Sequence, residues 1–336
     1  MPRPSVFVTR ALPGDPLPPL REVADVDVWP DEAPPPHDEL VRRAANADAL
    51  LTMLTDPIDT AVLNAGKRLR IVATMAVGYD NIDVAAATKR GILVTNTPGV
   101  LTETTADLTF ALLLAAARRI VEGDHLTRTG GWRSWHPSFL LGRDVHGATL
   151  GIVGLGQIGL AVARRARGFG MRILYHSRTR RPQAEAELGL EFVPLDRLLA
   201  QSDFVTLHVL LSTQTRHLIG ERQLALMKPT AILVNAARGQ VIDQRALYDA
   251  LKQRRIAAAA LDVAAVEPIP PDDPLLTLDN VIITPHIGSA SVATRGRMAE
   301  MAVESILTVF RGGMPTHCLN PEAVASKGRG AAERGE

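Results

Sequence analysis

Three side chains with complementary chemistry each follow an apolar run that has the length of a strand. A guanidinium binds carboxylates through paired donors, an imidazole exchanges protons near neutral pH, and a carboxylate can orient an imidazole. Taken singly, an ion-pair partner, a loop charge and a turn histidine are the commoner explanations. Parallel strands bind ligands at their carboxyl ends, so the three together favour a site. The residues are Arg238 after the run 231–235, Glu267 after the run 257–263 and His286 after the run 281–284.

A glycine-rich turn is expected to organise the sheet that positions these side chains. The run 149–153 predicts a buried strand, the stretch 161–169 predicts a helix, and three glycines between them have the spacing G-x-G-x-x-G. The first glycine allows a tight turn, the second lets the backbone approach a pyrophosphate, and the third lets the helix pack on the strand. The predicted dinucleotide site comprises Gly154, Leu155, Gly156, Gln157, Ile158 and Gly159.

The end of the next strand predicts which dinucleotide is bound. A cofactor without a 2′-phosphate favours an Asp or Glu there, which hydrogen-bonds the ribose hydroxyls. After the run 172–176 this chain has a serine and then basic residues. A hydroxyl and guanidinium groups can hold a phosphate dianion, so we expect NADP(H) to be preferred, with NAD(H) as the alternative. A charged loop is also commonly a solvated surface. The residues expected to read the phosphate are Ser177, Arg178, Thr179 and Arg181.

The first hundred residues alternate short apolar runs with short helical stretches, which predicts a parallel sheet covered on both faces. One run, 70–73, leads into a turn at the edge where such sheets bind ligands. Backbone amides in that glycine-containing turn, at 76–78, can grip a small carboxylate, although an ordinary loop is the alternative. Beyond this region we expect a long apolar helix at 103–119, with Thr104 in its first turn, and a final amphipathic helix at 291–311.

Length and composition exclude several classes of protein. The 336 residues have room for two domains, and the net charge of +1 gives no electrostatic reason for binding nucleic acid or a membrane surface. Cys318 is the only cysteine, which excludes an internal disulfide framework and a cysteine-based metal cluster, so no metal is expected. The N-terminus has no apolar signal segment, and the apolar stretch 108–117 is too short to span a bilayer. We therefore expect a cytoplasmic protein.

Motifs along most of the chain resemble those of one known family. They are VGYDNID at 77–83, GLGQIG at 154–159, NAARG at 235–239, LDV at 261–263 with Glu267 and Pro268, and TPHIGSAS at 284–291. In this order and spacing they resemble the D-isomer-specific 2-hydroxyacid dehydrogenases, over roughly Ser5 to Pro321. Within the family, SRTRR at 177–181 and GGWRSWHP at 130–137 are most similar to glyoxylate/hydroxypyruvate reductases.

The resemblance implies an α/β fold of two Rossmann- or flavodoxin-like parallel-sheet domains with a cleft between them. Family members are usually homodimers through the nucleotide-binding domain, and Trp135 would reach the active site of the partner. The C-terminal tail is polar without an apolar face, which is typical of disorder. The expected division is a substrate-binding domain of 1–99 and 289–321, an NAD(P)-binding Rossmann domain of 100–288, and a disordered tail of 322–336.

The resemblance also implies a role for each site residue. Arg238 would bind the substrate and polarise its carbonyl, His286 would be the acid or base, and Glu267 would orient His286. The amides of Val77 and Gly78 would hold the substrate carboxylate. A small, partly apolar pocket would be lined by Met53, Leu54 and Trp135. The further cofactor contacts expected are Thr104, Ala236, Ala237, Arg238, His286, Gly288 and Asp262, the last near the nicotinamide.

These expectations describe an NADPH-preferring reductase that converts a small 2-oxo acid, glyoxylate or hydroxypyruvate, into the D-2-hydroxy acid. Two alternatives stay open. One is another D-2-hydroxyacid dehydrogenase that uses NADH. The other is a cofactor-sensing binding protein similar to the transcriptional corepressors that share this fold and keep the arginine, glutamate and histidine. Measurable turnover of a 2-oxo acid separates the enzymes from the sensor.

Overall fold

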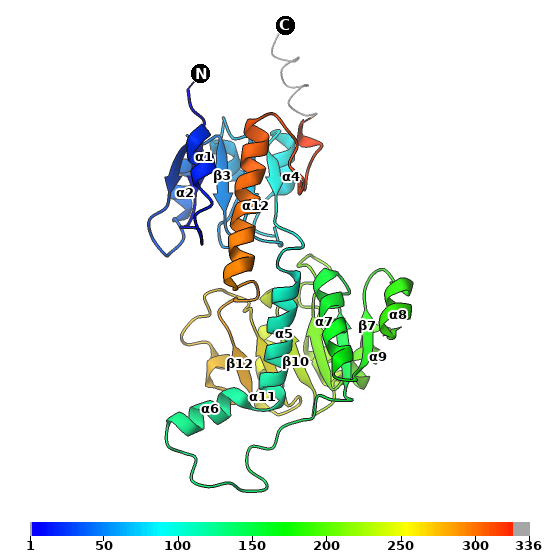
Figure 1. The fold of residues 1–336 in the computed structure, drawn as a ribbon. Coiled ribbons are helices and arrows are strands. Elements are labelled where there is room, and N and C mark those ends of the chain that lie inside the picture. The colour runs from blue at the N-terminus through cyan, green and yellow to red at the C-terminus, as the bar shows by residue number, and fades with distance from the viewer. Residues whose placement is uncertain (1, 325–336) are drawn as a thin grey trace. The chain divides into compact units, whose positions relative to one another are not determined.

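The computed structural model describes residues 2–324, and the chain divides into two compact units (Figure 1). The first holds the residues up to Leu101 and those from Ala290 onward, and the second is Thr102–Ser289. We placed these boundaries at 99 and 288 from the sequence. The start of the expected disordered tail is wrong, because Ala323 is buried and its amide donates to the carbonyl of Asn320 at 3.0 Å. The rest of that tail, 325–336, lies outside the described residues.

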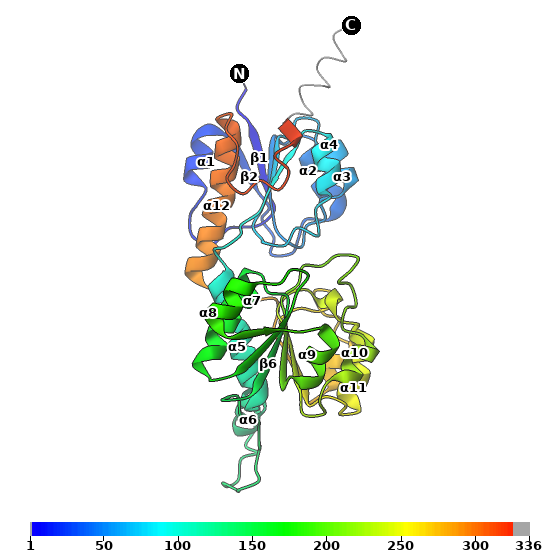
Figure 2. The same cartoon turned by 90° about the vertical axis from the view of Figure 1, so that its right-hand side faces the viewer.

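The described part of the first unit contains a five-stranded parallel sheet in the order β2-β1-β3-β4-β5. Alternate side chains of a strand point to opposite faces of the sheet. Val6 and Val8 therefore pack against the C-terminal helix α12, while Phe7 packs against the helices on the other face. Figure 2 shows α1 and α12 on one face and α2, α3 and α4 on the other. The elements are β1 (Ser5–Val8), α1 (Pro18–Val23), β2 (Asp25–Val28), α2 (His37–Ala44), β3 (Ala49–Thr52), α3 (Thr60–Ala65), β4 (Ile71–Thr74), α4 (Val84–Lys89), β5 (Leu93–Thr95) and α12 (Val292–Phe310).

The second unit, all of it described, contains a seven-stranded parallel sheet in the order β12-β11-β10-β9-β6-β7-β8. Strand order reverses at β6, and doubly wound sheets bind nucleotides at such a point. Helices α5 and α7 cover one face, and α9, α10 and α11 cover the other (Figure 2). The elements are α5 (Thr102–Ala117), α6 (Ile120–Arg128), β6 (Thr149–Val153), α7 (Gln157–Gly168), β7 (Arg172–His176), α8 (Pro182–Leu188), β8 (Leu190–Phe192), α9 (Leu195–Gln201), β9 (Phe204–Leu207), α10 (Glu221–Leu226), β10 (Ile232–Asn235), the 3-10 helix Gly239–Val241, α11 (Gln244–Lys252), β11 (Ala258–Leu261), the 3-10 helix Pro274–Thr277 and β12 (Val281–Ile283).

These two parallel sheets, each covered by helices on both faces, confirm the expected α/β class. Strands β3, β4, β9 and β10 are buried along their whole length, as central strands of such sheets must be. Within residues 2–324, no helix combines the length and apolar character needed to cross a membrane.

A long irregular loop joins α6 to β6 and carries the aromatic residues singled out in the sequence. It extends away from the sheet of its unit (Figure 1). Trp132, Trp135, Phe139 and Leu141 are exposed on it, and Trp135 reaches 79%. The loop leads into the amino end of β6. It therefore lies at the edge of the sheet opposite the carboxyl ends of the strands.

Candidate active site

The glycine-rich turn between β6 and α7 has the shape that its glycines predict. Gly154 has a φ of +97°, and a Cβ there would lie 2.6 Å from the carbonyl oxygen of His208. A Cβ on Gly159 would lie 2.3 Å from the carbonyl oxygen of Gly154, whereas one on Gly156 would meet nothing within 4 Å. This open space beside the first amides of α7 suits a pyrophosphate. The helix begins at Gln157, so the expected start at 161 is wrong by one turn.

The loop after β7 is braced by a buried tyrosine. The Tyr175 hydroxyl donates to Glu185 Oε1 at 2.6 Å and accepts from the amide of Arg181 at 2.8 Å. Arg180 donates to both oxygens of Glu185, at 2.9 and 2.8 Å. The Arg180 guanidinium, and secondly the tyrosine hydroxyl, hold the pKa of Glu185 below its usual value, while burial raises the pKa of Tyr175. The path of the backbone into α8 is therefore fixed by side chains beneath it.

Four residues of this loop were expected to read a 2′-phosphate. The Ser177 hydroxyl donates to the carbonyl of Thr179, which closes a tight turn. Arg178 and Arg181 present exposed side chains beside that turn. The braced loop thus carries the exposed guanidinium groups of Arg178 and Arg181 next to the end of β7.

The histidine and the glutamate expected to act together are paired. His286 Nδ1 lies 2.7 Å from Glu267 Oε2, and about a quarter of each side chain is exposed, 24% and 26%. The other carboxylate oxygen, Oε1, accepts from the amide of Ala264 at 3.1 Å. His286 has a φ of +52°, a region that costs residues other than glycine about 1–3 kcal/mol and is concentrated at functional sites. Because Nδ1 is used by Glu267, Nε2 is the nitrogen that can exchange a proton with a substrate.

A buried carboxylate at the end of β11 holds the histidine turn in this strained shape. Asp262 accepts from the hydroxyl of Thr284 at 2.6 Å and from the amides of Ile287 and Gly288 at 2.8 and 2.7 Å. Its own carbonyl accepts from the amide of His286 at 2.9 Å. We expected Asp262 to lie near the nicotinamide, and sequence reasoning missed that it shapes the turn. The available signal in the sequence was an acid inside the otherwise apolar run 257–263.

A buried asparagine shapes the turn that carries Arg238. Asn235, at the end of β10, donates from Nδ2 to the carbonyl of Arg238 at 2.9 Å and accepts at Oδ1 from the amide of Ala237 at 3.0 Å. The guanidinium of Arg238 donates to the carbonyl of Ala237 at 2.9 Å. An asparagine that bonds backbone groups two or three residues on is a common turn device. Asn235 was not among the predicted site residues, although its position as the last, polar residue of the run 231–235 was the available signal.

In the first unit, the turn after β4 is shaped in a similar way. Asn96 donates from Nδ2 to the carbonyl of Val77 at 2.8 Å, and the Thr97 amide donates to the carbonyl of Ala76 at 2.9 Å. Val77 and Gly78 are half-buried at the carboxyl edge of the sheet. Both of these hydrogen bonds are accepted by backbone carbonyls of the turn, those of Ala76 and Val77. The amides of Val77 and Gly78, which we predicted to bind a carboxylate, belong to the same turn.

The loop after β3, which carries Leu54, is held by a second acid that sequence reasoning missed. Asp56 is buried and accepts from the Thr9 hydroxyl at 2.5 Å and the Met53 amide at 2.7 Å. Burial raises the pKa of Asp56, although these hydrogen bonds and the nearby Arg10 guanidinium oppose the change. Leu54 itself is half-buried on the same edge as the turn after β4.

The predicted residues are thus distributed between the units. The second unit brings together Arg238, Glu267 and His286, which follow the adjacent strands β10, β11 and β12. Trp135 is not brought to these three within the second unit, because its loop leaves from the amino end of the sheet. Thr104 was expected to contact the cofactor. Its neighbour Thr105 lies close to Gly288, because a Cβ built on Gly288 would be 3.4 Å from the methyl group of Thr105.

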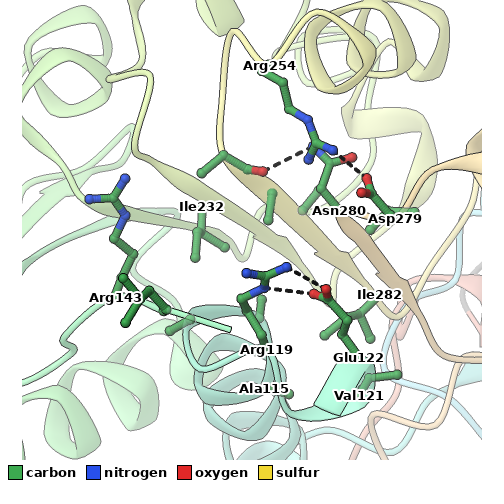
Figure 3. A pocket seen from close by; sticks show the side chains of 18 of the residues that line it. Ala115, Arg119, Val121, Glu122, Arg143, Ile232, Arg254, Asp279, Asn280 and Ile282 are labelled. Carbon is green, nitrogen blue, oxygen red and sulfur yellow. Dashed lines mark hydrogen bonds and ion pairs between the residues drawn. The ribbon is translucent and has the colours of Figure 1, made fainter. Parts of the chain in front are cut away.

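The second unit also has a pocket of about 620 Å³ at the amino edge of its sheet (Figure 3). Two ion pairs border it, Arg119 with Glu122 and Arg254 with Asp279. The wall between them comes from the starts of β11 and β12. This is the edge opposite the one that carries the catalytic candidates. Among the described residues, no three His, Cys, Asp or Glu side chains are grouped so that they could hold a metal ion.

Residues 110–288 match the family model described as D-isomer specific 2-hydroxyacid dehydrogenase, NAD binding domain. The chain belongs to this family. A glyoxylate reductase of Korarchaeum cryptofilum is 59% identical over 96% of the chain and 97% of the relative, and one of Thermococcus gammatolerans is 54% identical over 97% and 98%. The resemblance found in the sequence, including the similarity to glyoxylate reductases, is confirmed.

Solved structures agree with this assignment. The TT0316 protein from Thermus thermophilus is 48% identical, with a TM-score of 0.89, over 94% of this chain and 99% of its own. An NADPH-dependent glyoxylate/hydroxypyruvate reductase from Sinorhizobium meliloti, in complex with NADP and malonate, is 32% identical, with a TM-score of 0.84, over 96% of this chain and 98% of its own. As a D-2-hydroxyacid dehydrogenase, the protein is an NAD(P)-dependent oxidoreductase that reduces a 2-oxo acid. The glycine-rich turn, with its open side at Gly156, fits the nicotinamide cofactor of the family.

Proposed function

We propose that this D-2-hydroxyacid dehydrogenase reduces glyoxylate and hydroxypyruvate, the latter to the D-2-hydroxy acid, and that it prefers NADPH. The observation that carries the proposal is the 2.7 Å pairing of His286 with Glu267 beside the turn of Arg238. The names of the relatives support the substrate class, since those with 59% and 54% identity are glyoxylate reductases.

Reduction of a 2-oxo acid needs an anchor for the carboxylate, a polarised carbonyl and a proton for the oxygen that becomes a hydroxyl. When bound, the reduced nicotinamide supplies the hydride. Arg238 provides a planar fork of donors that binds the carboxylate and stabilises charge on the carbonyl oxygen. His286 delivers a proton from Nε2 to that oxygen, and Glu267 holds the ring through Nδ1 and stabilises its charged form.

The first unit contributes the remaining substrate contacts in this proposal. The amides of Val77 and Gly78 donate to the substrate carboxylate, and Leu54 and Met53 limit the size of the group attached to the keto carbon. A small site of this kind suits glyoxylate or hydroxypyruvate better than a bulky aromatic acid. The hypothesis would be lost if phenylpyruvate gave the highest kcat/KM among a panel of 2-oxo acids.

The cofactor preference rests on the loop after β7. Ser177, Arg178, Thr179 and Arg181 would hold the 2′-phosphate, and the carboxylate that would repel it is absent from the end of β7, where Ser177 follows His176. The solved Sinorhizobium meliloti relative is named as NADPH-dependent, which supports the same preference. The other contacts to the cofactor would come from Gly154 to Gly159, Ala236, Ala237, Asp262, Gly288 and Thr104.

We further propose a homodimer that forms through the second unit. Trp132, Trp135, Phe139 and Leu141 expose apolar area on one loop, and Ile120 and Val121 expose more on α6. Apolar side chains that gather on the surface of a protein often mark an interface. Trp135 would complete the active site of the partner. Size-exclusion chromatography with light scattering tests the assembly, and a monomer at micromolar concentration would exclude it.

The decisive experiment measures initial rates with glyoxylate and hydroxypyruvate, using NADPH and NADH in parallel. Faster oxidation of NADPH supports both the substrate class and the cofactor preference. Equal rates with NADH would keep the reductase and remove the preference. Absence of turnover with any 2-oxo acid, together with measurable binding of a nicotinamide cofactor, would favour the sensing protein instead.

A further inference from the structure

We infer that Gln240 and Gln244 are positioning residues that keep Glu267 on His286, an inference that rests on the catalytic roles proposed above. Glu267 lies on a loop without regular structure after β11. Its carboxylate must stay close to Nδ1 of His286, because catalytic groups lose efficiency when they move by about 0.5 Å. Something outside this loop must therefore restrain it.

The restraint is a pair of glutamine side chains, which hydrogen-bond the backbone carbonyl and the backbone amide of Ala265. Gln240 Nε2 donates to the carbonyl of Ala265 at 2.8 Å, and Gln244 Oε1 accepts from the amide of Ala265 at 2.8 Å. Ala265 lies two residues before Glu267. The preceding amide, that of Ala264, donates to Glu267 Oε1 at 3.1 Å, so the clamped backbone is continuous with the carboxylate it positions.

The two glutamines stand on the same short segment as Arg238. Gln240 lies in the 3-10 helix that follows Arg238, and Gln244 is the first residue of α11. A Cβ on Gly239 would lie 1.9 Å from the carbonyl carbon of Ala264, so this segment and the Glu267 loop touch with no room for a side chain. The segment that presents the guanidinium therefore also fixes the acid that orients the imidazole.

Neutral amides suit this position better than carboxylates. Gln244 Nε2 donates to Asp273 Oδ2 at 2.6 Å, which leaves its Oε1 to face the amide of Ala265. Asp273 is itself fixed, because its other oxygen accepts from the Leu275 amide at 2.9 Å. A glutamate at 244 could still accept from Ala265 but would repel Asp273. The clamp thus holds the loop without adding a negative charge near Glu267.

The test compares Gln240→Met and Gln244→Met with Gln253→Met, a control at the exposed end of α11. Methionine keeps the length of the side chain and removes its hydrogen bonds. Each of the first two variants should lower kcat about tenfold, as a 1.4 kcal/mol loss at the transition state would, while the Kd for cofactor changes less than twofold. The control should match the parent in kcat. Unchanged kcat in both clamp variants, with normal thermal unfolding, would overturn the inference.

A double-mutant cycle with Glu267→Gln separates this inference from the proposed function. If the glutamines act through Glu267, then adding Gln240→Met or Gln244→Met to Glu267→Gln causes little further loss of kcat. Full additivity would assign them a role other than positioning Glu267. A Glu267→Gln variant with undiminished kcat would instead refute the proposed role of Glu267 and the clamp with it.

Discussion

Asp262 Oδ2 accepts a hydrogen bond from the Gly288 amide at 2.7 Å, two residues past His286. The same acid accepts from the Ile287 amide and bonds the His286 amide through its carbonyl. Asp262 thus holds the backbone of His286, the candidate catalytic histidine, and Glu267 holds its ring.

Replacement of Asp262 by asparagine should therefore damage both stability and turnover. An amide nitrogen would face the Gly288 amide, where an oxygen now accepts. We expect the free energy of unfolding to fall by about 1–3 kcal/mol, measured with urea, and kcat to fall at least about tenfold. Asp279→Asn is the control, because Asp279 is 74% exposed and its pair with Arg254 is worth about 0–1 kcal/mol. Equal effects of the two changes would contradict this account.

His286→Ala should abolish proton delivery while sparing the cofactor site. We expect kcat to fall by about 10²–10⁴-fold, the usual contribution of a general acid, with the Kd for NADPH within twofold of the parent by fluorescence titration. Turnover that survives the substitution would remove His286 from the mechanism. Loss of cofactor binding would show that the ring supports the fold of the site rather than the proton step.

Arg178 and Arg181 should distinguish the two nicotinamide cofactors. Changing both to alanine removes two guanidinium donors from an exposed loop, so the KM for NADPH should rise about tenfold or more while that for NADH hardly changes. Arg197→Ala serves as the control, since Arg197 pairs with Glu191 on the surface at 2.7 Å. Equal losses with both cofactors would mean that these arginines do not read the phosphate.

His208 should make stability depend on pH below neutrality. Burial lowers the pKa of His208 from 6.5 to about 4. The unfolded chain therefore binds more protons than the folded protein in this window, and stability falls as pH drops from 6.5 towards 4. His208→Gln, which can still bond the Thr206 hydroxyl, should flatten the dependence by up to about 1.4 kcal/mol per pH unit. Urea unfolding at pH 6.5, 5.5 and 4.5 measures it, and parallel curves would rule out His208 as the source.

Much of the framework was predictable because buried strands and capped helices have local signals. The strands 149–153 and 172–176 have the bounds expected from the sequence. Strand β3 ends at Thr52, because the amide of Met53 already bonds Asp56. Helix α7 starts early because its first turn contains Gly159, the last of the three glycines that we assigned to the loop.

The supports of the site were harder to predict, because they depend on which loops meet. Arg238, Glu267 and His286 could be proposed from their positions after strands. The clamp on Ala265 joins it to residues 25 and 21 positions away in the sequence, Gln240 in a 3-10 helix and Gln244 at the start of α11. The same reason explains why Asp262 and Asn235 were missed as shaping residues, since a polar residue at a strand end does not reveal what it bonds.

The return of the chain to its first unit has a consequence for biosynthesis. Val6 and Leu51 share a core with Val303 and Ile306 of α12, so the earliest strands to leave a ribosome wait for one of the last helices before that face is covered. The second unit is one uninterrupted stretch and has no such delay. Contacts between sequence-distant segments form slowly and leave apolar surface exposed meanwhile. The nascent first unit therefore keeps apolar surface exposed for longer during synthesis than the second unit.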